Sequence, residues 1–165
     1  CVALGYGDAL GTELFSVIEP FADYAFNKSH AYGYGLIAYQ NAWLKVHYPV
    51  EYFCGLLTSV KDDKDKTAMY LSACKEMGIV VLVPDVNKSR ADFTPVAGDG
   101  GQDGRILFGL AAIRNVGSTL VDRIVAERDA GSEFKSFEDF CRRMDPSVLS
   151  QRTLPSLIYA GAFDS

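Results

Sequence analysis

Residues 109–128, which read Gly-Leu-Ala-Ala-Ile-Arg-Asn-Val-Gly-Ser-Thr-Leu-Val-Asp-Arg-Ile-Val-Ala-Glu-Arg, carry the clearest fold signal of the chain. A short apolar helix is expected first, followed by a tight turn at residues 115–117 with a hydrophobic residue at its centre. A longer amphipathic helix then begins at Ser118 or Thr119, because its apolar residues recur at the spacing of one helix face. These residues are Leu120, Val121, Ile124 and Val125. The stretch therefore predicts two helices joined by a tight hairpin.

This hairpin resembles the helix-hairpin-helix element of many DNA-binding proteins, whose turn reads Gly-hydrophobic-Gly. Asn115 stands at the first glycine position, and asparagine tolerates a left-handed backbone better than most residues. Free N–H groups in the hairpin and in the first turn of the second helix can bind consecutive phosphates without reading bases. We therefore predict a duplex-DNA contact made by Arg114, Asn115, Val116, Gly117, Ser118 and Thr119. The alternative is an ordinary helical hairpin in a core.

A second motif lies at residues 24–34, Tyr-Ala-Phe-Asn-Lys-Ser-His-Ala-Tyr-Gly-Tyr. An amide, an ammonium, a hydroxyl and an imidazole follow one another at residues 27–30, with aromatic rings on both sides. Such donors suit phosphate oxygens, and flat rings suit a base or a sugar. Ser29 is the expected N-cap of the helix that follows. The alternative is a polar helix cap with aromatic residues at the surface.

The rest of the chain predicts a mainly α fold with a small β element. Periodicity, caps and breakers predict helices at residues 8–19, 34–48, 50–60, 62–77 and 137–144, and a last one that opens at Ser150 or Thr153 and closes at Gly161. The second and third of these are expected to form the core of the first part of the chain. Strands are expected at residues 79–83, 91–96 and 105–108, with a glycine-rich hairpin tip between the last two. Residues 154–163 are expected to form a degenerate second hairpin.

Composition allows a folded core and gives only weak guidance on partners. The chain has 165 residues, of which 48% are hydrophobic and 22% charged, and its net charge is −5. Acidity argues mildly against a nucleic-acid partner, but residues 24–61 hold three lysines against one glutamate, and residues 104–152 hold eight basic against seven acidic side chains. The two motifs therefore lie in the regions where basic residues outnumber acidic ones, which are the regions most favourable for binding phosphate.

No metal site or membrane span is expected. The four cysteines form no Cys-x-x-Cys pair and the chain has only two histidines, so we predict free thiols and a cytoplasmic protein. Residues 61–66 contain three lysines and three aspartates but lack the central glycine and distal glutamate of a calcium loop. An aspartate N-cap at residue 62 or 63 is therefore the better interpretation. No apolar run approaches the ~18 residues that a membrane span needs.

Five separated motifs agree in order and spacing with one known family. They are residues 21–34, residues 39–52, Gly78 with residues 84–87, residues 109–117 and residues 161–164. Together they resemble the alpha subunits of bacterial DNA polymerase III, the C family of replicative DNA polymerases, over nearly the whole chain. The resemblance implies that residues 1–90 belong to a helical fingers domain. It implies that residues 91–165 form a tandem helix-hairpin-helix region that grips duplex DNA.

The resemblance also implies roles for the second motif. Lys28 and His30 would hold the triphosphate of an incoming dNTP, Asn27 and Ser29 would position them, and Tyr34 would support the base or sugar. The family is a nucleotidyltransferase whose Mg²⁺-binding aspartates lie upstream of the matching region. We therefore expect no catalytic residue and no cofactor here, Mg²⁺ in the full polymerase, and no activity of this piece alone. Expected partners are primer-template DNA, dNTP, the rest of the polymerase chain and replisome subunits, with no membrane.

Two other function classes remain: a non-catalytic helix-hairpin-helix module that binds DNA, and an interaction domain that binds no nucleic acid. Arg142 and Arg143 either reach phosphates or solvate a helix end. The chain starts at Cys1 rather than at a methionine and is expected to be part of a larger protein. A cysteine is one of the residues that protein splicing leaves in first position, and a mere sequence boundary explains it equally well.

Overall fold

The structure is a computed structural model, and it describes residues 1–22, 28–97, 104–146, 149 and 151–164. Contacts divide the chain into two compact units, Cys1–Val46 and His47–Ser165. The predicted boundary near residue 90 falls inside the second unit, and the functional division that it expresses stays a prediction.

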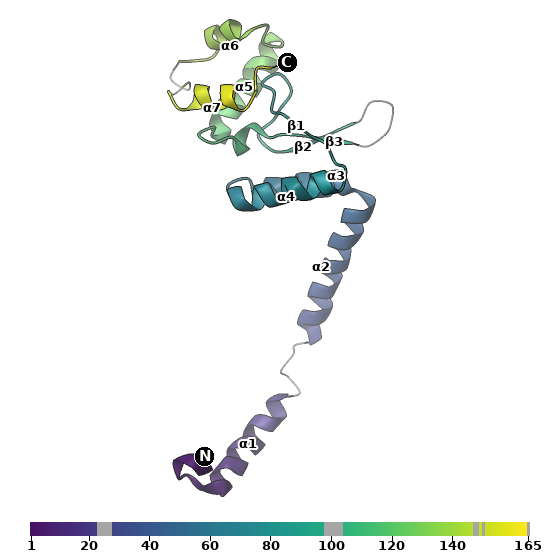
Figure 1. Cartoon of the computed structure of the whole chain (residues 1–165), viewed down its shortest axis with the longest axis vertical. Coiled ribbons are helices and arrows are strands. Elements are labelled where there is room, and N and C mark those ends of the chain that lie inside the picture. The colour runs from purple at the N-terminus through teal and green to yellow at the C-terminus, as the bar shows by residue number, and fades with distance from the viewer. Residues whose placement is uncertain (23–27, 98–103, 147–148, 150, 165) are drawn as a thin grey trace. The chain divides into compact units, whose positions relative to one another are not determined.

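The first unit is helical and has no buried side chain in its helices. A 3-10 helix, η1 (Val2–Leu4), precedes α1 (Gly7–Ala22), and α2 (Lys28–His47) follows (Figure 1). Two expectations need correction. Pro20 lies inside α1 rather than ending it, because its fixed φ suits the helix and only one hydrogen bond near the last turn is lost. Ser29 lies within the first turn of α2, so it is not the N-cap.

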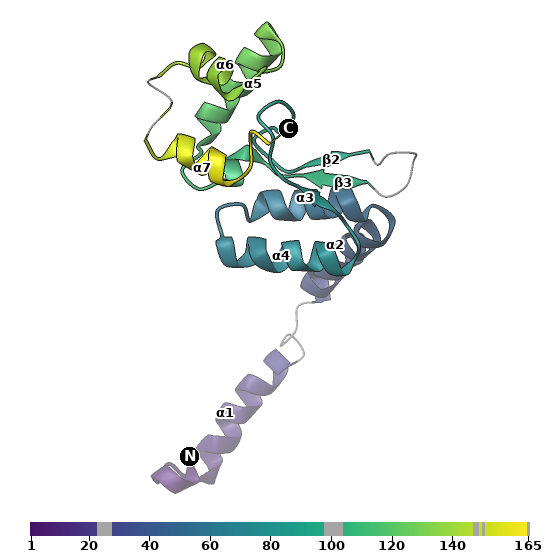
Figure 2. The same cartoon turned by 45° about the horizontal axis from the view of Figure 1, so that its top comes forward.

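The second unit begins with two helices that cover a small sheet. These are α3 (Pro49–Ser59), with Pro49 at its first position, and α4 (Lys64–Glu76), which contacts α3 (Figure 2). The Asp63 carboxylate caps α4 by accepting the Lys66 N–H at 3.1 Å, and this bond lowers the pKa of Asp63. Gly78 adopts a left-handed φ of 74°, and this conformation ends the helical path after α4. The predicted aspartate cap and glycine break are confirmed.

Within the described residues, the sheet has three short strands in the order β1-β3-β2. β2 (Thr94–Val96) pairs antiparallel with β3 (Arg105–Leu107), as expected for a hairpin, whose tip at residues 98–103 lies outside the described residues. β1 (Val81–Leu82) pairs with β3 in parallel, with Val81 opposite Ile106. All three strands are shorter than predicted.

The sheet and the first two helices of this unit share one core. Its buried residues are Phe53, Cys54, Leu57, Cys74, Ile79, Phe93 and Ile106. The sequence predicted that residues 34–48 and 50–60 would form the core together. That was wrong for the first of them, because the apolar residues of α2 are spread around the helix and none is buried, whereas α3 directs one face at α4 and the sheet.

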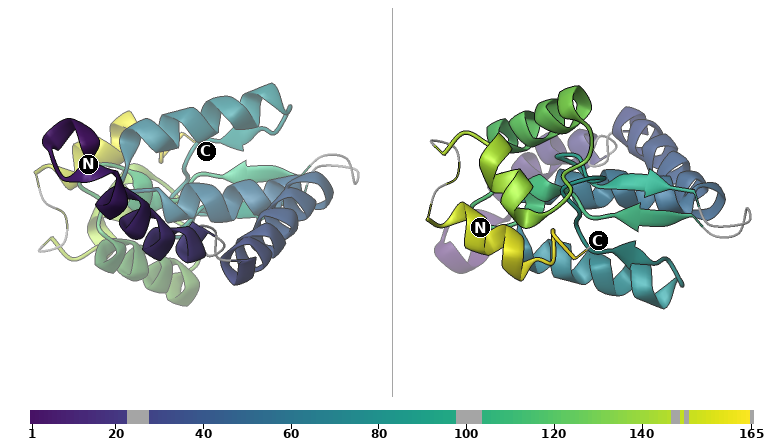
Figure 3. Two further views of the ribbon diagram at one scale, coloured as in Figure 1. Left: turned by 90° about the horizontal axis from the view of Figure 1, so that it is seen from below. Right: turned by 90° about the horizontal axis from the view of Figure 1, so that it is seen from above.

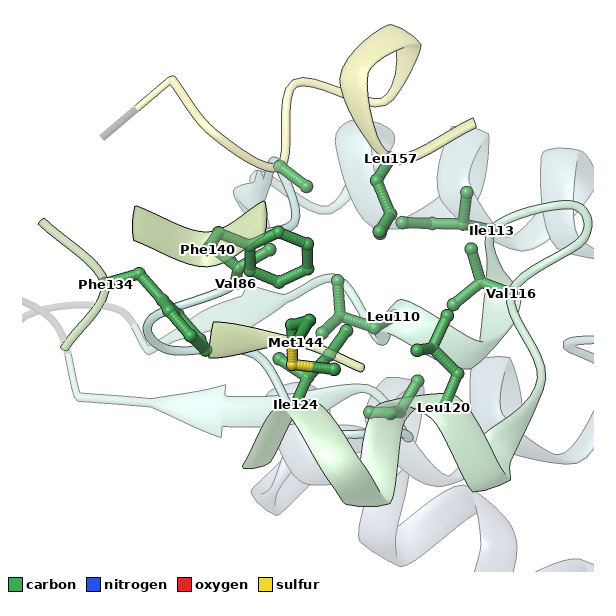
Figure 4. Packing of buried hydrophobic residues seen from close by; sticks show 12 residues of the cluster. Val86, Leu110, Ile113, Val116, Leu120, Ile124, Phe134, Phe140, Met144 and Leu157 are labelled. Atoms are coloured by element: carbon green, nitrogen blue, oxygen red, sulfur yellow. The ribbon is translucent and has the colours of Figure 1, made fainter. Parts of the chain in front are cut away.

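The C-terminal helices surround a second core. A 3-10 helix, η3 (Leu110–Ala112), is followed by α5 (Ser118–Gly131), α6 (Phe137–Arg143) and α7 (Thr153–Tyr159) (Figure 3). Twelve buried residues fill the space between them, with Leu110, Ile124, Phe140 and Leu157 fully enclosed (Figure 4). The start of α5 at Ser118 agrees with expectation. So does the N-cap of α6, where the Ser136 hydroxyl accepts the Asp139 N–H at 3.2 Å. A mainly α fold with a small β element is confirmed.

Residues 84–89 are attached to this core by buried and partly buried hydrogen bonds. The Asn87 side chain donates to the Phe134 carbonyl at 3.0 Å and accepts the Phe134 N–H at 2.8 Å. The Arg128 guanidinium donates to the carbonyls of Val86 and Ser89, both at 3.1 Å. These bonds give the motif at residues 84–87 a structural role: it joins the sheet to the ends of the C-terminal helices.

The four cysteines are free thiols, as predicted. Burial, assisted by Glu51 and Cys74, raises the pKa of Cys54 to about 12, and burial raises that of Cys74 to about 11. Both thiols therefore stay protonated at neutral pH. Within the described residues, no three or more His, Cys, Asp or Glu side chains gather in a way that suits a metal ion. No helix in that part of the chain is both long and apolar enough to cross a membrane.

Candidate nucleic-acid interface

The turn between η3 and α5 is an exposed backbone loop anchored by one buried side chain. Val116 is 4% exposed and its N–H donates to the Ile113 carbonyl at 3.1 Å, so this residue fixes the loop to the core. Arg114, Asn115, Gly117, Ser118 and Thr119 are all exposed. The structure therefore places five of the six predicted DNA-contacting residues at the surface and shows that the sixth holds them there.

The backbone at this turn has the conformation that the sequence predicts. Asn115 adopts a left-handed φ of 63°, and Gly117 is the N-cap of α5 with extended angles of −83° and 155°. Gly117 has no side chain to cap the helix, and its carbonyl accepts the N–H groups of Leu120 and Val121. The N–H groups of Ser118 and Thr119 have no carbonyl one turn earlier within the helix. They point out of the positive end of a 14-residue helix, which is a favourable place for an anion.

Helix α7 holds this turn in place. The Thr153 hydroxyl donates to the Asn115 carbonyl at 3.1 Å, and the Asn115 side chain donates to the Ser156 hydroxyl at 3.2 Å. Thr153 is 5% exposed, so the first of these bonds is shielded from water. Sequence reasoning did not identify Thr153 and Ser156. The available signal was their three-residue spacing, which puts two hydroxyls on one face of a helix.

We predict that replacing Asn115 by valine lowers the free energy of unfolding by about 1–2 kcal/mol more than replacing it by glycine does, because a β-branched residue strains the left-handed backbone. Both substitutions remove the hydrogen bond to Ser156, so the difference between the unfolding free energies of the two variants reports the cost of the left-handed backbone alone. Urea denaturation followed by circular dichroism measures it. Equal stabilities for the two variants would show that the left-handed conformation is not required.

Two glycines near the turn have different surroundings. A Cβ added at Gly109 would lie 2.6 Å from the Ala91 carbonyl oxygen, so this glycine is needed for packing. A Cβ added at Gly117 would meet nothing within 4 Å. Packing within the chain therefore does not explain the glycine at position 117.

The two arginines of α6 have different surroundings. The Arg143 side chain is 17% exposed and lies over the Phe134 ring at 4.4 Å. Its guanidinium donates to oxygens of Glu127, Ser132, Glu133 and Asp139. It therefore ties the end of α5 to α6 and is engaged inside the protein. Arg142 is exposed. A hydrogen bond with Ser136 lowers the pKa of Glu138, the Lys135 N–H lowers that of Asp139, and the nearby charge of Arg142 adds to both effects.

The donor-rich motif of the first unit lies at the start of α2. Lys28, Ser29 and His30 are in its first turn and are exposed, whereas Asn27 lies outside the described residues. The rings of His30 and Tyr34, one turn apart, are in tilted contact, with centroids 4.0 Å apart and planes inclined by 43°. The structure thus brings an imidazole and a phenol together on the same side of the helix, beside the lysine that begins it.

The comparisons with known proteins agree with this geometry. Residues 78–165, more than half of the chain, match the family described as the helix-hairpin-helix motif, and the chain belongs to that family. It is also 50% identical over 163 residues, 99% of its length, to DNA polymerase III subunit alpha of Mycobacterium tuberculosis strain H37Rv. The proteins of the same name from Deinococcus radiodurans and Thermus aquaticus are 47% identical over 155 residues and 44% identical over 161 residues. The resemblance that the motifs predicted is confirmed.

The chain spans 11–13% of the length of these relatives. The three matches include 99%, 94% and 98% of this chain, so the similarity extends over both units. What the relatives do as whole proteins is therefore a basis for a proposal about this chain.

Proposed function

We propose that this chain is a segment of a DNA-directed DNA polymerase, in which the second unit binds the backbone of duplex DNA without regard to sequence. The observation that carries the proposal is the turn at residues 115–117, which combines a left-handed Asn115, an unobstructed Gly117 and the exposed start of α5. Backbone N–H groups bind phosphate oxygens and carry no base information, so contacts of this kind position a duplex and do not select it.

The start of α2 contributes contacts to the triphosphate of an incoming dNTP in this proposal. Lys28 supplies a positive charge and His30 a ring donor, and the Tyr34 ring in contact with the imidazole supports it and offers a surface to the base or sugar. Asn27 and Ser29 take positioning roles. Phosphoryl transfer depends mainly on positioning and charge stabilisation, so side chains that touch no reacting oxygen still affect its rate.

The chain's own residues are given no metal-binding role in this proposal. Mg²⁺, when bound to a polymerase, neutralises developing charge on the transferred phosphoryl group. The described residues offer no carboxylate cluster for it, so the proposal assigns the metal ligands to other segments of a longer polymerase. The segment is accordingly inert alone.

The apolar surfaces of α1 and α2 fit a segment that works inside a larger assembly. Large side chains such as Phe15, Phe21 and Tyr32 are more than 60% exposed. Helices that are apolar on several faces are normally buried. In the proposal, the remainder of the polymerase chain covers them, and replisome subunits bind elsewhere on that chain.

The test is the binding of the 165-residue chain to fluorescent duplexes of equal length and unrelated sequence, measured by anisotropy over a range of salt concentrations. We expect affinities that agree within about threefold between sequences, and a steady loss of affinity as salt rises, because binding releases counterions from the phosphates. Strong preference for one sequence, or no binding at low salt by the folded chain, would contradict the proposed DNA contact.

A further inference from the structure

A groove in the second unit separates the DNA-binding turn from the loop between α3 and α4. Its volume is about 430 Å³. One wall consists of residues 111–117, which contain the proposed phosphate-binding turn, and the other wall consists of Lys61, Asp62 and Lys64. The two walls are about 50 residues apart in the sequence and meet only through the fold.

The charges of this groove suit a polyanion. Arg114 lies on the first wall, and two lysines against one aspartate lie on the second. Lys61 is paired with Asp92 at 2.6 Å, which reduces its contribution. No ion pair in the described part of the chain engages Lys64. Lys64 and Arg114 are therefore the cations on opposite walls that an incoming phosphate meets.

The lysine-bearing loop is held firmly by its own contacts. The Asp63 N–H and the Thr67 hydroxyl both donate to the Val60 carbonyl, at 2.8 and 3.0 Å. The Asp63 carboxylate caps α4, and the ion pair between Lys61 and Asp92 fixes the loop to the segment before β2. Lys64 is the first residue of α4, directly after this loop. A cation on a preorganised segment loses less conformational entropy when it binds an anion than one on a mobile segment does.

We propose that the phosphate-binding surface continues across this groove, and that Lys64 contacts a second phosphate of the duplex held by the turn at residues 115–117. This inference rests on the proposed DNA contact and adds the loop between α3 and α4 to it. Lys64 attracts the phosphate backbone of the duplex, and the negative charge of Asp62 repels it. Lys61 acts mainly by anchoring the loop through its ion pair with Asp92. The partner is duplex DNA rather than an acidic protein, because the facing wall presents backbone N–H groups and a helix start.

The test compares Lys64→Gln, Asp62→Asn and Lys75→Gln in the whole chain, with anisotropy of a fluorescent duplex as the readout. Lys75 lies in the last turn of the same helix and is not part of this groove, so it is the matched control. We expect Lys64→Gln to weaken binding by about three- to tenfold at low salt and to reduce the slope of log K against log salt by about one. Asp62→Asn should strengthen binding, and Lys75→Gln should leave both quantities unchanged.

The outcomes separate this inference from the proposal on which it rests. If Gly117→Val weakens binding while Lys64→Gln behaves like Lys75→Gln, the groove is not part of the interface and the contact at the turn stands. If the unaltered, folded chain binds no duplex at low salt, the proposed DNA contact fails and the groove fails with it.

Discussion

Replacing Lys28 or His30 by alanine in the polymerase to which we assign this chain is expected to lower the efficiency of dNTP incorporation by about one to two orders of magnitude. A charge-assisted hydrogen bond to phosphate contributes about 1.5–3 kcal/mol, and each 1.4 kcal/mol corresponds to a factor of ten. Affinity for primer-template DNA should stay nearly the same, because the proposed DNA contact belongs to the second unit. Single-turnover kinetics on a primed template, with a separate binding titration, measures both quantities.

Lys45→Ala is the matched control for this prediction. Lys45 lies on the same helix, about 25 Å further along its axis at 1.5 Å per residue, so its loss should not affect incorporation in this way. If Lys28→Ala and His30→Ala both incorporate nucleotides as efficiently as the unaltered enzyme, the motif only stabilises the start of α2 and does not contact the dNTP. A non-catalytic DNA-binding module would then be the better interpretation of the chain.

Replacing Gly117 by valine is expected to weaken binding of duplex DNA by about ten- to a hundredfold, because a branched side chain blocks phosphate from the N–H groups at the start of α5 and one or two charged hydrogen bonds are lost. The native structure has open space at this position, and its extended backbone accepts valine. The variant should therefore fold normally by circular dichroism while losing affinity in the anisotropy assay.

Two further variants make this result specific. Gly117→Ala should have an intermediate effect because its side chain is shorter. Arg142→Ala should reduce affinity less than Gly117→Val, since Arg142 stands near acidic neighbours on α6. If Arg142→Ala reduced DNA affinity as much as Gly117→Val or more, the DNA contact would have to be assigned to α6 rather than to the turn.

The hairpin was predictable because its signals are local. A left-handed residue, a glycine and an amphipathic helix follow one another within 20 residues, and each has a conformational preference that agrees with its neighbours. The same holds for the caps at Asp63 and Ser136, where a short side chain only has to reach an N–H three residues away. Local agreement of this kind also explains why the family resemblance could be recognised.

The features that sequence did not reveal depend on distant pairing. The parallel contact of β1 with β3 joins residues 25 positions apart, and no local pattern specifies it. The bond from Thr153 to Asn115 and the position of Lys64 and Arg114 on opposite walls of one groove likewise require the finished fold. The prediction that residues 34–48 form a core with residues 50–60 was wrong. The apolar content of a helix indicates that it is normally buried but does not identify the segment that buries it.

The most direct test of the central claim is an amide ¹H–¹⁵N correlation spectrum of the chain, recorded while a short DNA duplex is added. The account predicts that the largest shifts occur at residues 114–119, and that they are the same for two duplexes of unrelated sequence. Replacing phosphates by uncharged methylphosphonates should abolish them, because the contact is with backbone oxygens. Amides at residues 114–119 that do not move while DNA binds elsewhere, or shifts that depend on the base sequence, would contradict it.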